Sequence, residues 1–189
     1  MTKRFGFTLA EVLITLGIIG VVAAMTIPTL MNQSSQAVFR TGLKKMVSVL
    51  NQAITMNVAL NDSDFSALPS GDTTGSVWGM LQSRMNVMKT TVSATTDMGS
   101  ASGAPFNTSN YTMYLSDGMT IAVNTAKGNC GTVTDKCAMV VDVNGMKGPN
   151  TLSSATDTSS SLSDQFVMNF YNQQILPMNR PGQYALYGK

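Results

Sequence analysis

The chain has 189 residues, a formal net charge of +2 at pH 7 and 12% charged side chains, about half the share of an average globular protein. It contains no histidine, so it cannot build a Ser–His or Cys–His nucleophilic pair or a histidine-ligated zinc site, and it lacks the GxGxxG and GxxxxGK[ST] phosphate loops. This composition argues against an enzyme, and no run of Lys and Arg interleaved with aromatic residues indicates a nucleic-acid partner.

The N-terminal residues predict a membrane segment. Lys3 and Arg4 precede an uncharged, apolar run from Val12 to Met31, which as a helix would rise about 30 Å, the thickness of the hydrocarbon core of a bilayer. The positive-inside rule keeps the basic end in the cytoplasm and exports the remainder. Glu11, the only glutamate in the chain, stands at the head of this run. Because an ionisable group in a membrane segment is costly unless something compensates it, Glu11 is a candidate functional residue.

A secretory signal peptide is the competing interpretation of the same residues. The small residues at Val22-Ala23-Ala24 fit a cleavage site that would leave Met25 as the first mature residue. The apolar run continues past this site to Met31, and an acid at the start of such a run is unusual in a signal peptide. The two interpretations predict different mature N-termini.

Beyond Met31, apolar residues from Phe39 to Val58 recur at helical spacing, and polar residues fall on the other side. We therefore expect one helix that continues to about Leu60, with an amphipathic second half. Pro28 removes a backbone donor, so the stretch from Gly20 to Pro28 is where a kink is expected.

The rest of the chain predicts a small α+β domain. Asp117-Gly118 between two alternating segments is a strong hairpin signal, and Cys137 to Val143 reads as another strand. On the exported side, Cys130 and Cys137 are expected to form a disulfide bond. The remaining segments are expected to be a loop at 61–76, a short helix from Val77 to Met88, irregular chain at 89–109, a mobile Ser/Thr-rich loop at 151–164, one strand at 164–177 and an exposed tail at 179–189.

The segment KRFG followed by FTLAEVLITLGIIGVV resembles the N-terminus of type IV pilins and type II secretion pseudopilins. The resemblance implies that a prepilin peptidase cleaves between Gly6 and Phe7 and N-methylates Phe7. It also implies a pilin-like fold, in which a long N-terminal helix packs on a small antiparallel sheet, and Pro28 matches a proline found in many pilin helices. The implied organisation is a leader at 1–6, a transmembrane and assembly half-helix at 7–31, an amphipathic half-helix at 32–60 and an extracytoplasmic domain at 61–189.

In such a filament, Glu11 of one subunit would neutralise the Phe7 amine of a neighbour, because each charge is costly alone in a water-poor helix bundle. The simpler interpretation is that Glu11 only favours the N-terminus of its own helix. Substitution of Glu11 distinguishes the two.

Residues 142–150, DVNGMKGPN, resemble a segment of many pseudopilin-like proteins, and Asp164-Gln-Phe fits the pattern that follows it. Asp142, Asn144 and Asp164 carry oxygen atoms that could bind calcium, as in some major pseudopilins. However, Lys147 lies inside the loop and Ser153 stands where an EF-hand has its last acidic ligand. A turn held by Asp and Asn side chains explains the same residues without a metal, and no other cofactor is expected.

Together these features predict a structural subunit of an extracytoplasmic filament, either a type IV pilus or a secretion or DNA-uptake pseudopilus. Its expected partners are the prepilin peptidase, other copies of itself, related pilins, the inner membrane and an assembly platform. The alternative from a different class is an exported or singly anchored binding module without a filament role.

Overall fold

The computed structural model describes residues 6–71, 73–92, 110–124, 128–145, 147–152 and 162–188. The chain divides into two compact units, residues 1–37 and 38–189, and a single helix, α1 (Leu9–Asn61), contributes to both. In the first unit, α1 carries no buried residue. In the second unit it buries one face, so the predicted change from an apolar to an amphipathic half is confirmed.

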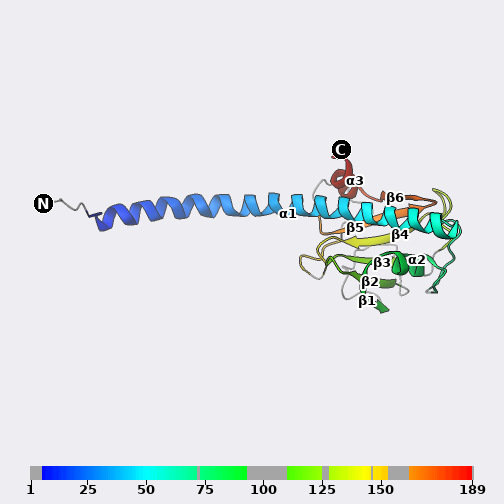
Figure 1. The fold of residues 1–189 in the computed structure, drawn as a ribbon. Coiled ribbons are helices and arrows are strands. Elements are labelled where there is room, and N and C mark those ends of the chain that lie inside the picture. Colours follow the sequence, from blue (N-terminus) through cyan, green and yellow to red (C-terminus); the bar gives the residue numbers. More distant parts are fainter. Residues whose placement is uncertain are drawn as a thin grey trace. The chain divides into compact units, whose positions relative to one another are not determined.

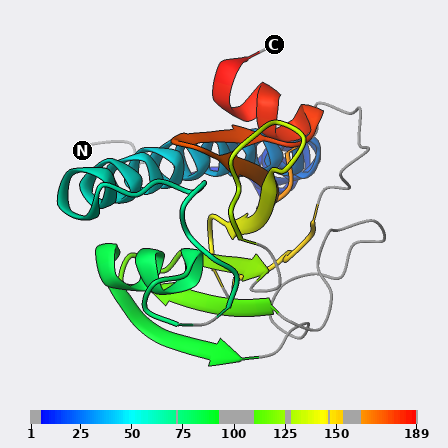
Figure 2. The same ribbon diagram turned by 90° about the vertical axis from the view of Figure 1, so that its right-hand side faces the viewer.

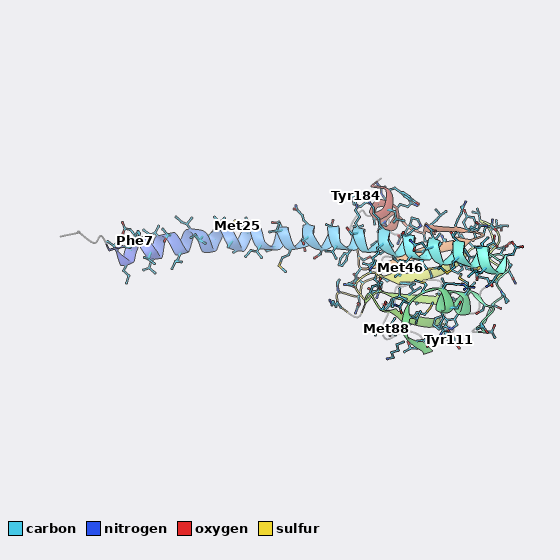
Figure 3. The ribbon with its side chains drawn as sticks, in the orientation of Figure 1. Phe7, Met25, Met46, Met88, Tyr111 and Tyr184 are labelled. Atoms are coloured by element: carbon cyan, nitrogen blue, oxygen red, sulfur yellow. A yellow bond between two sulfur atoms is a disulfide. The ribbon has the colours of Figure 1, made fainter. Side chains whose placement is uncertain are left out.

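The second unit is a six-stranded antiparallel sheet in sequential order. Its strands are β1 (Val87–Val92), β2 (Asn110–Leu115), β3 (Thr120–Asn124), β4 (Cys137–Asp142), β5 (Gln165–Tyr171) and β6 (Gln174–Pro177). The second half of α1 lies along one face of this sheet (Figure 1), and the Met46 side chain points from the helix toward the strands (Figure 3). Leu43, Met46 and Leu50 of α1 are fully buried in the same core as the alternating inward residues of β4 and β5. The α+β fold expected from the sequence is confirmed.

Two short helices complete the second unit. Helix α2 (Val77–Arg84) begins at the N-cap Ser76 and packs Trp78 against Tyr111 of β2, with ring centroids 5.1 Å apart. Helix α3 (Arg180–Tyr187) lies beside β6 and α1 (Figure 2). Trp78 and Phe166 are core residues.

Three sequence-based predictions about the second unit are wrong. Residues 87–92 are not helical or irregular but form the edge strand β1, whose Met88 is 74% exposed and therefore leaves little hydrophobic signal. The segment 164–177 is not one strand but the hairpin β5–β6, which turns at Asn172 with a φ of +49°, a conformation that asparagine tolerates better than most residues. Most of the expected irregular segment and Ser/Thr-rich loop lies outside the described residues.

The third error is the exposed tail, which is helix α3. Asn179 caps its N-terminus by accepting a hydrogen bond from the Gly182 amide at 3.1 Å, Pro181 occupies the first turn, and Gly188 ends the helix in a left-handed conformation. Arg40 of α1 holds the other end, donating to the Tyr184 carbonyl at 3.0 Å with its guanidinium 4.8 Å from the Tyr184 ring centroid. A cation at the C-terminus of a helix complements its dipole.

The disulfide bond between Cys130 and Cys137 is present, as expected, with the two Cα atoms 5.6 Å apart. It sits where three loops meet. The Cys130 amide donates to the Phe65 carbonyl at 2.8 Å, the Phe65 amide donates to the Asn172 carbonyl at 3.0 Å, and the Asn172 amide donates to the Cys130 carbonyl at 2.8 Å. The rings of Phe65 and Phe170, with centroids 4.7 Å apart, pack beside these three hydrogen bonds. The disulfide therefore helps to fix the loops at the C-terminal end of α1.

Replacing both cysteines with serine should lower the free energy of unfolding of the second unit by about 2 to 3 kcal/mol, because the open loop gains conformational entropy in the unfolded state. Denaturant unfolding of the full chain in detergent micelles, followed by Trp78 fluorescence, measures this loss. Reduction of the wild-type protein should give a similar loss, and equal midpoints for oxidised, reduced and serine forms would contradict the prediction.

Candidate functional site

The residues around the expected cleavage site lie at the start of α1. Gly6, Phe7 and Thr8 precede the helix without regular structure, and α1 begins at Leu9. The Phe7 side chain is 90% exposed and stands out from the chain (Figure 3). A Cβ atom built on Gly6 would meet nothing within 4 Å. The Gly6–Phe7 bond is thus placed in non-helical chain, two residues before the helix.

Thr8 and Glu11 form a capping box at this helix start. The carboxylate Oε2 of Glu11 accepts from the Thr8 amide and from the Thr8 hydroxyl, both at 2.8 Å, and the Glu11 amide donates to the Thr8 hydroxyl at 3.3 Å. This reciprocal pattern satisfies amide groups that have no partner inside the helix. It fixes the direction of the Glu11 side chain at the edge of the apolar run.

Thr8 was not singled out by the sequence analysis, although Thr8-Leu-Ala-Glu11 is the Thr-x-x-Glu spacing of a capping box. The only glutamate of the chain therefore has a local structural role. Because both of its bonds to Thr8 use Oε2, the other carboxylate oxygen, Oε1, can accept a hydrogen bond from another group.

The surface that follows Glu11 is apolar and exposed. Among the described helices, α1 is the one that contains a window long and apolar enough to cross a membrane, with a mean hydropathy of 2.2 and no burial inside the protein. Its large exposed side chains are Leu9, Val12, Leu13, Ile14, Leu16, Ile18, Ile19, Val21, Val22, Met25, Ile27, Leu30 and Met31. A helix that is apolar all round needs lipid or other protein around it.

Pro28 lies inside α1, which continues through it as helix. Proline lacks the amide that would bond to the carbonyl one turn earlier. Threonine hydroxyls on either side bond to helix carbonyls, Thr26 to Val22 at 3.0 Å and Thr29 to Thr26 at 2.8 Å. The expected kink between Gly20 and Pro28 stays a prediction.

Comparison with known proteins agrees with this arrangement. Residues 1–27 match the family model described as the prokaryotic N-terminal methylation motif. No curated protein and no solved structure matches the chain. The N-terminus therefore carries a type IV pilin or pseudopilin type of signal, which supports a prepilin-type precursor. The signal and the apolar helix together indicate anchoring in a membrane.

The second candidate cluster, Asp142, Asn144 and Asp164, lies at the ends of β4 and β5. Asp142 Oδ1 accepts from the amides of Asn144 and Gly145 at 3.0 and 2.7 Å, and its Oδ2 accepts from Gln165 Nε2 at 2.9 Å. Asn144 donates from its side chain to the Gly148 carbonyl at 3.3 Å. Gly145 has a φ of +66°, and a Cβ there would clash with the Gly118 carbonyl, so this turn requires glycine.

Asp164 has a similar set of donors from the opposite side of the loop. Its Oδ2 accepts from the Asn150 amide at 2.6 Å, and its Oδ1 accepts from the Thr151 amide at 2.8 Å. Both aspartates are fully buried. All four carboxylate oxygens therefore accept hydrogen bonds from N–H donors. These hydrogen bonds fit a turn held by Asp and Asn side chains.

We therefore expect millimolar Ca²⁺ to leave the melting temperature of the full chain unchanged, in comparison with the same protein in EDTA. Differential scanning calorimetry measures the shift. A rise in melting temperature that disappears in Asp164→Asn would show that these residues bind the cation after rearrangement.

Asp142 should also make stability depend on pH. Burial raises the pKa of Asp142 from 3.8 to about 6, with the nearby charge of Asp164 adding to the rise and the bonds from Gln165 and Asn144 opposing it. Between pH 4 and 6 the folded protein thus retains a proton that the unfolded chain has lost. The resulting stabilisation is complete below pH 4 and is lost as the pH rises through 6.

When the pH falls from 7 to 4, the free energy of unfolding of the wild type should rise relative to that of Asp142→Asn by up to about 3 kcal/mol. Denaturant unfolding of both proteins in EDTA, from pH 4 to 7, measures the difference. A constant gap between the two proteins across this range would contradict a raised pKa.

Proposed function

We propose that the protein is a structural subunit that polymerises through α1 into an extracytoplasmic filament, after a prepilin peptidase removes residues 1–6 and methylates the amine of Phe7. The observation that carries the proposal is the placement of the Glu11 carboxylate, which Thr8 holds at the head of the exposed, otherwise uncharged first half of α1, four residues after Phe7. The match to the methylation motif supports the processing step.

Cleavage changes the charge at this end of the helix. In the precursor, the Phe7 nitrogen is a neutral amide, and Lys3 and Arg4 precede it. After cleavage the two cations are gone and the same nitrogen is a charged amine. In a bundle of apolar helices an amine and a carboxylate are costly separately, and pairing with hydrogen bonds offsets much of that cost.

The capping box suits such a pair. Thr8 binds Glu11 through Oε2, so Oε1 can accept from the Phe7 amine of a neighbouring copy without loss of the cap. In this proposal Thr8 is a positioning residue, because it orients the carboxylate that makes the contact between subunits. The pair also sets the register of one helix against the next.

The mature N-terminus tests the processing step. Mass spectrometry of protein from the producing cell should find N-methylated Phe7 as the first residue. Met25 as first residue would instead support a secreted binding module released after Ala24.

The variant Glu11→Gln tests the pairing, because it removes the charge and keeps the size of the side chain. We expect normal cleavage and membrane insertion but more than about a tenfold loss of protein in the sheared filament fraction, since a buried amine would be left without its counter-charge. Thr8→Ala should cause a smaller loss, and Thr8→Ser, which keeps the hydroxyl, should assemble normally. Normal assembly of Glu11→Gln would rule out the pairing.

The proposal also concerns the type of filament, a type IV pilus or a pseudopilus. The DVNGMKGPN segment favours a pseudopilus over a type IV pilus. A major subunit should dominate the sheared surface fraction, and a minor subunit should not.

A further inference from the structure

An open groove of about 960 Å³ runs along the second half of α1. One wall consists of α1 residues that recur at helical spacing from Lys44 to Ala59, a length of about 22 Å at the rise of an α-helix. The other wall consists of Ile175 of β6 and of Leu186 and Tyr187 of α3. A groove this long and open is suited to a segment of protein, because small-molecule sites enclose most of their ligand.

The groove has a basic end. Lys44 is the one charged residue among its described lining residues, and no carboxylate lines it. Arg40 lies one turn earlier on the same helix and is bound to Tyr184 of α3, as described above. Val47, Leu186 and Tyr187 add apolar surface to the groove, and Tyr187 is 57% exposed. A partner that fits here presents an acid next to an apolar side chain.

The loop between the two cysteines has this chemistry. Residues 132–136 are exposed, and Val133, a large apolar side chain, is 62% exposed. Asp135 stands two residues later. Bonds within the loop hold it in shape: the Thr132 hydroxyl accepts from the Asp135 amide at 3.1 Å and lies 2.8 Å from the Thr134 hydroxyl. Because the disulfide and these bonds order the loop in advance, binding through it loses little conformational entropy.

The loop and the basic end of the groove lie at opposite ends of the second unit. The base of the loop is bonded to Phe65, just past the C-terminal end of α1, whereas Lys44 lies about 25 Å earlier along the helix. A contact between them cannot form within one copy. Two different surfaces of one chain that bind each other make a head-to-tail contact, which propagates into a filament unless its rotation closes a ring.

We propose that the Cys130–Cys137 loop of one copy docks at the basic end of the α1 groove of a second copy, with Asp135 beside Lys44 and Val133 against Leu186 and Tyr187. The proposal rests on the proposed filament function and adds to it a contact between the globular units. The contact is independent of the Glu11 pair, so each can be tested without the other.

Charge reversal tests the contact in the full chain. Lys44→Glu and Asp135→Lys should each lower the protein in the sheared filament fraction by about fivefold, because each places like charges together. The combination of both substitutions in one chain restores an opposite-charge pair and should bring assembly back toward the wild-type level. Lys89→Glu on β1 is a matched reversal outside the contact and should assemble normally.

A zero-length carbodiimide cross-link provides a direct readout, since it joins a lysine amine and a carboxylate only when they touch. Membranes from cells with mixed isotope labels should give a Lys44–Asp135 cross-link between light and heavy copies. Single reversals that assemble normally, or a combined variant no better than either single one, would overturn the proposal. Filaments without the cross-link would overturn it and leave the filament function standing. A cross-link in a protein that forms no filaments would support the contact and overturn the filament function.

Discussion

One helix has to be stable in two surroundings, and the rest of the structure depends on how α1 meets that constraint. Its first half is apolar on all sides and carries one acid, at the end where the helix begins. Its second half keeps one apolar face, which supplies Leu43, Met46 and Leu50 to the core of the sheet. Because a helix satisfies its own backbone bonds, the same element can pass from lipid to water without leaving polar groups unpaired.

The long elements could be predicted from the sequence because each has a strong local signal. Twenty uncharged residues, an apolar stripe at helical spacing and an Asp-Gly turn gave α1 and the β2–β3 hairpin. The errors fall on short elements. The edge strand β1 exposes Met88 and Lys89, and α3 shows its capping residues Asn179 and Gly188 but buries only part of one face. Such elements owe their stability to neighbours that lie far away in sequence.

The candidate site residues also divide into those whose surroundings could be predicted from the sequence and those whose surroundings could not. The placement of Glu11 could be predicted from its position and from the resemblance of the flanking residues, and the role of Thr8 was present in the spacing of the capping box. The environment of Asp142 and Asp164 could not be predicted, because it depends on amide groups of Asn150 and Thr151 and on a side chain from the next strand, Gln165. Which N–H groups bond to these carboxylate oxygens depends on the fold and cannot be inferred from the list of oxygen-bearing residues.

The position of the helix start has a consequence for the peptidase proposed to act on this chain. A protease holds its substrate in an extended form, and a bond inside a helix must first be unwound. Here the cap at Thr8 keeps Gly6 and Phe7 outside the helix, while Leu9 is already inside it. The capping box thus fixes the distance between the bond proposed to be cleaved, Gly6–Phe7, and the first turn of the helix. A peptidase could therefore cut there without unwinding α1, the element through which we propose that the subunits assemble.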